Sequence, residues 1–238
     1  YTPSRFISLA NTLGEVPVAT AALGPVAGLP ASRLVASHFS VMTESSLVLI
    51  AGPKVVKRAL NIDITKEALG GPEVHLKSGV INNFAKTEDD AFEQIKTFLS
   101  FVPDNAWTFP DSISTNDKED RCDDLLIDII PKDRRRPYSV RKIITSLLDI
   151  NDDQSTFFEI GKKYGPSLVT GLGRLNGQSV GVIANDCMFY AGAMTTSASK
   201  KLERFSDFCN SFHIPIISLV DEPGFMIGPE SEKSGTIR

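Results

Sequence analysis

The stretch VPVATAALGPVAGLP, residues 16–30, sets a short apolar run between two prolines and then turns through Gly28. Near the other end, IPIISLVDEPGFMIG at residues 214–228 repeats this plan, with a Val-Pro or Ile-Pro pair, an apolar run and a second proline eight residues after the first. Short apolar runs bounded by glycine and proline are typical of buried strands that end in tight turns. The chain therefore contains one strand-and-turn block twice, which predicts a duplicated architecture.

Helical patterns, among them residues 53–60 and 87–102, alternate with apolar runs on both sides of a changed middle region. Between residues 103 and 137, prolines, paired aspartates and a basic run predict an extended connector. The dipeptide Asn176-Gly177 between two apolar runs predicts a β-hairpin. The segment LGGPEVHLKSGV, residues 69–80, is expected to be a loop. Strands alternating with helices on both sides of the connector predict an α/β protein of two units.

Composition excludes several classes of function. The chain has 238 residues, of which 42% are hydrophobic and 23% charged, as in an ordinary soluble globular protein. A formal net charge of −4 argues against nucleic acid as a partner, and no apolar run is long enough to span a membrane. The widely spaced Cys122, Cys187 and Cys209 are expected to be free thiols in a reducing compartment, with cytoplasm and mitochondrial matrix left open.

Familiar side-chain motifs for nucleophiles, phosphate loops and zinc are absent from the sequence. What remains is backbone chemistry, because a turn from a strand into a helix leaves amide N–H groups unpaired. Two such donors aimed at one point form an oxyanion hole. The Gly28 and Leu29 amides are candidates for this role, and the turn at Pro223, Gly224 and Phe225 is of the same type. The alternative reading is that these glycines only permit tight turns.

Several collinear motifs carry a family resemblance. GPVAG at 24–28, IAGPKVVK at 50–57, ALGGPEVHLKSGV at 68–80, FFEI at 157–160, RLNGQSVGVIAN at 174–185 and IPIISLVDEPGFMIG resemble the carboxyltransferase subunit of biotin-dependent acyl-CoA carboxylases. Lys201, Arg204-Phe205, Glu232, Gly235 and Arg238 extend the match. This is the propionyl-CoA and acetyl-CoA carboxylase β-type group of the crotonase superfamily. The chain is similar to the middle half of such a subunit.

The resemblance implies an α/β, crotonase-like (ClpP/crotonase) ββα superhelix with parts of two duplicated domains. We expect residues 1–103 to be the end of the first carboxyltransferase domain, 104–137 a connector, and 138–238 the start of the second domain. The upstream portion, which would bind much of coenzyme A, is expected to be missing. The downstream glycine-rich turn that supplies the second domain's oxyanion hole is also expected to be missing, so the turn at 223–228 is expected to line the biotin side without completing that hole. The implied activity is transfer of CO2 from carboxybiotin on a partner carrier domain to the α-carbon of a coenzyme A thioester. The implied partners are acyl-CoA, a biotin carboxylase or biotin carrier subunit, and further copies in a hexamer.

In that mechanism both biotin and the acyl thioester develop negative charge on a carbonyl oxygen. The resemblance therefore implies two oxyanion holes and no side-chain base with a strongly shifted pKa. The resemblance assigns catalysis to the amides of Gly28 and Leu29, and no residue to a metal. Residues implied on the acyl-CoA side are Gly24, Ala27, Gly70, Gly71 and His75. Residues implied on the biotin side are Gly192, Pro223, Gly224, Phe225 and Gly228.

The chain departs from the family pattern at two positions, with Leu29 and Ser234 where glycines are usual. Leu29 keeps its N–H but is expected to narrow the pocket, and Pro30 has no N–H to donate. Three alternatives therefore stay open. They are biotin-linked decarboxylation or transcarboxylation, hydratase or hydrolase chemistry, and a catalytically altered scaffold paralogue within a carboxylase complex.

Single charged residues have two readings each. His75 either contacts coenzyme A or orders its own loop. Lys201 could reach a phosphate or a carboxylate but is expected on a solvated helix face. The run at 132–136 could attract a coenzyme A phosphate but is expected in a solvated linker. Asp221 and Glu222 either act as acids or cap the next turn. Glu232 and Arg238 are expected to form an ion pair.

Overall fold

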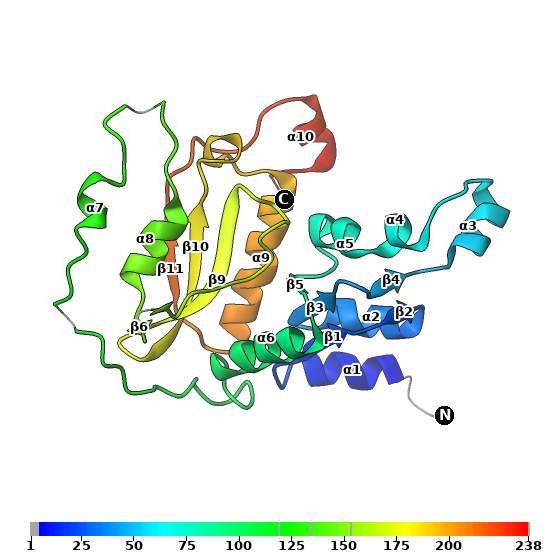
Figure 1. Cartoon of the computed structure of the whole chain (residues 1–238), viewed down its shortest axis with the longest axis horizontal. Helices are drawn as coiled ribbons and strands as arrows, with labels where there is room; N and C mark the ends of the chain where they lie inside the picture. The colour runs from blue at the N-terminus through cyan, green and yellow to red at the C-terminus, as the bar shows by residue number, and fades with distance from the viewer. Residues whose placement is uncertain (1–4, 119, 134, 153, 238) are drawn as a thin grey trace. The chain divides into compact units, whose positions relative to one another are not determined.

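The computed structural model describes residues 5–118, 120–133, 135–152 and 154–237 (Figure 1). These residues form two compact units, of which the first holds 5–100 with 104–107 and the second holds 101–103 with 108–237. From residue 108 onward the expected connector therefore belongs to the second unit. No helix in the described ranges has both the length and the apolar character needed to cross a membrane.

The first unit contains the elements from α1 to α6. They are α1 (Arg5–Leu13), β1 (Ala19–Ala22), β2 (Pro25–Ala27), α2 (Leu29–Ala36), β3 (Phe39–Thr43), β4 (Leu47–Leu49), α3 (Pro53–Leu60), α4 (Lys66–Gly70), α5 (Pro72–Ser78), β5 (Asn83–Ala85) and α6 (Glu88–Ser100). The predicted helices at 53–60 and 87–102 are confirmed as α3 and α6. The expected loop at 69–80 is wrong, because Pro72 opens α5 and the left-handed Gly79 closes it.

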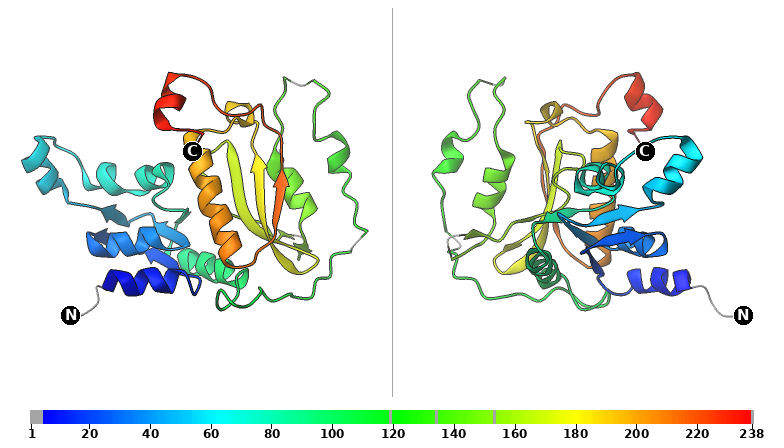
Figure 2. Two further views of the ribbon diagram at one scale, coloured as in Figure 1. Left: turned by 180° about the vertical axis from the view of Figure 1, so that it is seen from behind. Right: turned by 45° about the vertical axis from the view of Figure 1, so that its right-hand side comes forward.

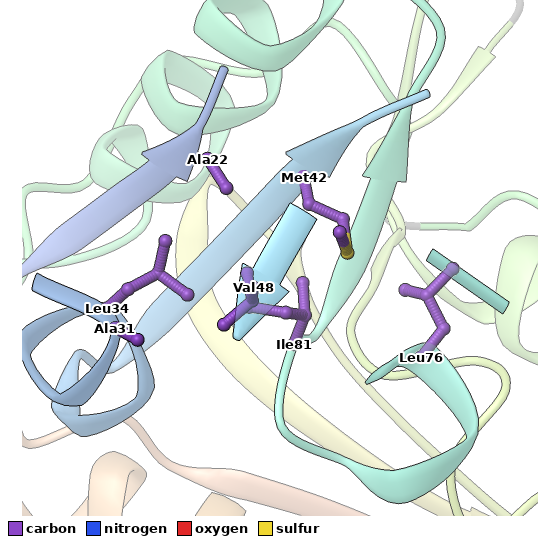
Figure 3. Packing of buried hydrophobic residues seen from close by; sticks show 7 residues of the cluster. All are labelled: Ala22, Ala31, Leu34, Met42, Val48, Leu76 and Ile81. Carbon is purple, nitrogen blue, oxygen red and sulfur yellow. The ribbon is translucent and has the colours of Figure 1, made fainter. Parts of the chain in front are cut away.

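Two parallel sheets build the first unit. One has the strand order β1-β3-β5 and the other pairs β2 with β4. Apolar side chains from strands, helices and loops meet between them in a core shown in Figure 3: Ala22, Ala31, Leu34, Met42, Val48, Leu76 and Ile81. On the α6 side, Phe39 stacks on Phe98 with ring centroids 5.0 Å apart. Burial of these side chains fixes β4 and α2, the two elements that flank Gly28.

The second unit contains one larger sheet. The elements of this unit are α7 (Leu125–Asp128), α8 (Val140–Leu147), β6 (Ile150–Asn151), β7 (Gln154–Ser155), β8 (Phe158–Glu159), β9 (Leu168–Leu175), β10 (Gln178–Asn185), the 3-10 turn η1 (Tyr190–Gly192), α9 (Thr196–Ser211), β11 (Ile216–Leu219) and α10 (Pro229–Ser234). The sheet order is β11-β10-β9-β8. The predicted hairpin at Asn176-Gly177 is confirmed, since β9 and β10 are antiparallel across it.

Helices α8 and α9 cover opposite faces of this sheet (Figure 2). Val180, Val182 and Ala184 of β10 pack with α8 in the core. The intervening Gly181 faces α9, where an added Cβ would lie 2.8 Å from the Cys209 sulfur. This alternation is the period of two that a strand requires when both of its faces are covered. The strands β10 and β11 are parallel, so their carboxyl ends lie at the same edge of the sheet.

Candidate functional site

The first candidate turn joins β2 to α2. Gly28 has φ 65° and ψ −131°, a conformation that side chains disfavour, and no atom lies within 4 Å of where its Cβ would be. Glycine is therefore required here for backbone conformation and not for space. The Gly28 N–H donates to the Leu49 carbonyl at 3.1 Å, which extends the pairing of β2 with β4. The expectation of a free Gly28 donor is thus wrong, because strand pairing already uses that amide.

Leu29 supplies the amide that this turn leaves available. It is the first residue of α2, and its N–H makes no hydrogen bond among the residues that the structure describes. The following Pro30 has no N–H. A free amide in the first turn of a helix is aligned with the helix dipole and attracts negative charge. Leu29 as a whole residue is 47% exposed.

Strand β4 is held in place by the segment that the resemblance assigned to the acyl-CoA side. His75 Nε2 lies 2.6 Å from the Val48 carbonyl oxygen, and because a carbonyl only accepts, Nε2 carries the hydrogen. His75 Nδ1 is buried without a hydrogen-bond partner. A Cβ on Gly70 would lie 2.3 Å from the same carbonyl, so glycine is needed for this close approach. Gly70 and His75 therefore fix β4, which in turn fixes Gly28.

Gly71 serves the same segment at its next residue. It caps α5, and an added Cβ would lie 2.6 Å from the Glu67 carbonyl oxygen. Gly24 accepts the Leu47 N–H at 3.3 Å, and Ala27 pairs with Leu49 in the register of β2 and β4. The structure thus brings Gly24, Ala27 and Gly28 together along β4. No ligand contact is needed to explain Gly70 or Gly71.

The second candidate turn repeats the hydrogen bonds of the first. Met226 stands three residues after Pro223, as Gly28 stands three after Pro25, and its N–H donates to the Met194 carbonyl at 2.8 Å. Met194 in turn donates to Gly224 at 2.9 Å and forms a parallel bridge with Phe225. The doubled sequence therefore encodes a doubled backbone connection. The counterpart of Leu29 is Ile227, which is 88% exposed.

Residues predicted for the biotin side come together at the carboxyl ends of β10 and β11. A Cβ on Gly192 would lie 2.6 Å from the Asp221 carbonyl oxygen, so these two segments are in direct contact. Gly224 and Gly228 have φ of 116° and 127° and face open space where a Cβ would project. Pro223 and Phe225 are exposed beside them, Phe225 to 52%. The arrangement leaves an accessible, partly apolar surface at this edge.

A polar network that sequence reasoning missed holds this edge together. The Tyr138 hydroxyl donates to Asp221 Oδ2 at 2.6 Å, and burial together with that bond raises the pKa of Tyr138. Asn185 contacts Gly192, Asp221 and Glu222. Asp221 and Glu222 are therefore acceptors within a network. No local pattern in the sequence indicates this network, because Tyr138 lies 83 residues from Asp221.

The second unit also contains partly and fully buried charged residues. Arg141 forms ion pairs with Glu159, at 2.6 Å, and with Asp186. Lys201 is 7% exposed and donates to the Leu168 carbonyl at 2.6 Å, so its expected place on a solvated face is wrong. Burial lowers the pKa of Lys201 to about 8. Its neighbours on α9, Phe205 and Cys209, are also buried, so the helical spacing placed Lys201 on the core face.

The remaining predictions concern Ser234, the basic run, the ion pair of Glu232 with Arg238, and metal binding. Ser234, one of the two departures from the family pattern, hydrogen-bonds to Thr196 at 2.5 Å and so ties α10 to the start of α9. The described residues of the basic run are exposed, as expected. Arg238 lies outside the described residues, as does its expected pairing with Glu232. Within the described ranges, no group of three His, Cys, Asp or Glu residues is placed to hold a metal ion.

The second unit also has two surface cavities, of about 520 and 580 Å³, that lie away from the candidate turn of this unit. The first is lined by Asp117, Arg121 and Asp149, whose charged groups bond to one another or to backbone. The second lies around Phe109 and His213, whose rings are 5.1 Å apart. Neither contains a residue predicted for the site. The candidate chemistry is therefore at the strand-to-turn connections and not in these cavities.

These observations define a class of protein: an α/β chain with a duplicated turn that presents backbone amides, suited to polarising a carbonyl oxygen. Comparison with known proteins narrows the class. The model of the carboxyl transferase domain family matches residues 5–238. The chain therefore belongs to the carboxyl transferase domain family, and its fold is crotonase-like.

Relatives and solved structures agree with this assignment. The chain is 36% identical over 227 residues to the propionyl-CoA carboxylase carboxyltransferase subunit of Haloferax mediterranei, covering 94% of this chain and 43% of the relative. It is 34% identical over 235 residues to the methylmalonyl-CoA decarboxylase subunit alpha of Veillonella parvula, and the match covers 98% of this chain and 45% of the relative. The crystal structure of the transcarboxylase 12S hexamer with hydrolysed methylmalonyl-coenzyme A matches with a TM-score of 0.91 at 35% identity, covering 98% and 45%. The chain spans less than half the length of these relatives.

Proposed function

We propose that the intact protein is the carboxyltransferase subunit of a biotin-dependent acyl-CoA carboxylase. The observation that carries the proposal is the doubled connection, in which Gly28 and Met226 make the same hydrogen bond and each is followed by an exposed residue whose N–H makes no hydrogen bond among the described residues. Two carbonyl-bearing substrates that must each accept negative charge would use two such turns. The family match over residues 5–238 supports the same reaction class.

We assign residues 1–103 to the first carboxyltransferase domain and 138–238 to the second, with 104–137 connecting them. In the first domain, the Leu29 N–H is the donor to a developing thioester oxyanion, where α2 adds its dipole. Gly70 and His75 act indirectly, by holding β4 and through it the Gly28 turn. Gly24 and Ala27 shape the same strand.

In the second domain, we assign Gly192, Pro223, Gly224, Phe225 and Gly228 to the biotin side. The residues present are compatible with a flat ureido ring, because Gly224 and Gly228 leave space and Phe225 offers an exposed ring. Carboxylated biotin on a carrier domain would supply the carboxyl group there. The chain's own residues would orient that carrier's ring and exclude water from it.

The proposed partners are an acyl-CoA, a biotin carboxylase or biotin carrier subunit, and further copies of the protein. The structural relative forms a hexamer, which supports the homo-oligomer. A second candidate is biotin-linked decarboxylation, because the Veillonella relative is a methylmalonyl-CoA decarboxylase subunit at nearly the same identity. Both reactions use the same turns and differ in the direction of carboxyl transfer.

The test uses the intact protein with a carrier whose biotin bears a carbon-14 carboxyl group, and a panel of acyl-CoA thioesters. We expect label in the acyl-CoA product and its loss when avidin is added. Absence of label in every acyl-CoA contradicts the proposal. Avidin-sensitive transfer of a carbon-14 carboxyl group from labelled methylmalonyl-CoA to the carrier's biotin, without transfer in the opposite direction, favours the decarboxylase.

A further inference from the structure

The carboxyl end of β10 carries a buried amide that the proposed mechanism does not use. Asn185 is the last residue of β10 and is 5% exposed. The neighbouring parallel strand β11 ends at Leu219, so the residues that follow both strands lie at the same edge. Those residues include Gly192 on one side and Gly224 with Phe225 on the other. Asn185 therefore lies between the two segments assigned to the biotin side.

Each polar atom of the Asn185 side chain has a partner in one of these segments. Its Nδ2 donates to the Gly192 carbonyl at 3.2 Å and to Glu222 Oε2 at 3.0 Å. Its Oδ1 accepts the Asp221 N–H at 3.3 Å. One amide group thus connects η1 with the turn that follows β11. A side chain needs both a donor and an acceptor to make these bonds, and asparagine supplies both.

The segment that Asn185 holds is strained. Tyr190 and Ala191 have φ of 52° and 53°, and Gly192 has φ 80°, so three consecutive residues are left-handed. Non-glycine residues disfavour this conformation, and such backbone persists only where its surroundings enforce it. The segment leads directly to Met194, whose backbone bonds to Gly224 and Met226. A shift at Gly192 would therefore be transmitted to the turn at 224–226.

We propose that Asn185 is a positioning residue for the biotin side of the site, setting the distance between Gly192 and the turn at 221–226. This inference rests on the proposed function, because it names that surface as the place where the carrier's biotin ring lies. Asn185 acts through these two segments and does not touch substrate. Its loss should impair use of the biotin carrier while leaving the acyl-CoA side intact.

Asn185→Asp is the sharpest variant, because it keeps the shape of the side chain and changes one donor into an acceptor. The new carboxylate would face Glu222 Oε2 and the Gly192 carbonyl, so both contacts would become repulsive. The matched control is Asn210→Asp, the same change at an exposed position on α9. Combining Asn185→Asp with Glu222→Gln restores one bond with donor and acceptor exchanged. Glu222→Ala removes one contact without burying a charge, and serves if Asn185→Asp does not fold.

The experiment measures KM and kcat for the biotin carrier and for acyl-CoA separately in the intact protein, together with calorimetric titration of biotin and the melting temperature. We expect Asn185→Asp to lower kcat/KM for the carrier by about 10- to 100-fold, as misplacement of a site by about 1 Å does. The KM for acyl-CoA should match that of Asn210→Asp. The double variant should recover part of the loss, and Glu222→Ala should show a smaller loss of the same kind.

The inference is overturned if Asn185→Asp uses the carrier as well as Asn210→Asp does. It is also overturned if the constants for both substrates fall together with the melting temperature. If the unsubstituted protein transfers no carboxyl group, the proposed function fails, and the biotin titration then decides the inference alone. Biotin binding weakened in Asn185→Asp but not in Asn210→Asp supports it, and equal or absent binding overturns it.

Discussion

The two copies of the strand-and-turn block share one backbone connection and then diverge. In the first copy, α2 begins at Leu29, directly after the bond from Gly28 to Leu49, and runs for 8 residues. In the second copy, the bond from Met226 to Met194 is followed by Ile227 and Gly228, and the 6-residue α10 begins only at Pro229. The free amide therefore opens a helix in the first copy and precedes one in the second.

Comparison of the two copies shows that the need for glycine and the shared hydrogen bond are independent of each other. The first copy needs glycine at position 28 because φ is positive there, whereas methionine stands at the equivalent position 226 and makes the same hydrogen bond. The hydrogen bond is thus common to both copies and glycine is not. What distinguishes the first copy is a helix that starts at once and adds its dipole to the Leu29 amide. We infer that the first copy is the stronger oxyanion donor.

The largest expected effect comes from removing that amide. Leu29→Pro deletes the N–H at the first helical position, where proline is favourable, so α2 should persist. We expect kcat to fall by about 10²- to 10³-fold, the usual result of losing one oxyanion donor. Ile227→Pro, the equivalent change in the second copy, should cost about 10-fold or less. Steady-state assays of both intact variants measure the contrast.

Leu29→Ala is the control for the side chain, since it keeps the amide and removes only side-chain atoms of an exposed residue. Its kcat should stay close to that of the unsubstituted protein, with a change in preferred acyl length. If Leu29→Pro and Leu29→Ala have the same kcat, the amide is not a donor. If Ile227→Pro has the larger effect, the ranking of the two copies is reversed.

Sequence reasoning reached the duplication because proline spacing and apolar runs are local signals. It also found α3, α6 and the hairpin at Asn176-Gly177, which depend on caps and turn residues close in sequence. Their backbone preferences are fixed within a few residues, so tertiary contacts did not override them. The family motifs then identified the fold, because they extend over nearly the whole chain.

The site was less predictable, because its details depend on contacts between distant residues. Gly28 was expected to offer a free amide, but only the register of β2 and β4 reveals that Leu49 takes it. Lys201 beside Lys200 read as a solvated pair, although the rotation of α9 buries one and exposes the other. Asn185 had no local signal at all, since its partners lie up to 37 residues away.

A smaller effect should distinguish the two copies in stability. Gly28→Ala forces a side chain into φ 65° and ψ −131° with no atom within 4 Å to clash, so its cost is conformational. We expect the free energy of unfolding to fall by about 1–3 kcal/mol. Met226→Ala changes only a side chain at the equivalent position and should cost about 1 kcal/mol or less. Urea denaturation of the two variants measures the difference, and equal losses would show that glycine is not required by conformation.

The smallest expected effect concerns charge burial, which also differs between the units. The buried polar residues described in the first unit are Ser37, Ser40, Thr43 and Ser46, whereas the second unit buries Lys201 with its pKa lowered to about 8. Below pH 8 this lysine is protonated in both states, and its burial weakens the fold. As pH rises from about 8 toward the ordinary value of about 10.4, the unfolded chain binds more protons than the folded one. The free energy of unfolding should therefore rise, by at most about 1.4 kcal/mol per pH unit.

Cys209 has an opposing pH dependence. Burial raises its pKa to about 12, which lowers stability as pH rises above the ordinary thiol value. Comparison with Lys201→Met separates the two contributions. Both proteins contain Cys209, so only the lysine differs. Between pH 8 and 9 the unsubstituted protein should gain stability relative to Lys201→Met. Hydrogen-exchange protection factors, corrected for the intrinsic rate at each pH, should place the gain in β9 and α9 and not in β3 and α6. A parallel pH dependence in the two proteins would mean that Lys201 stays charged in the folded state, with Leu168 and the nearby carboxylates offsetting its burial.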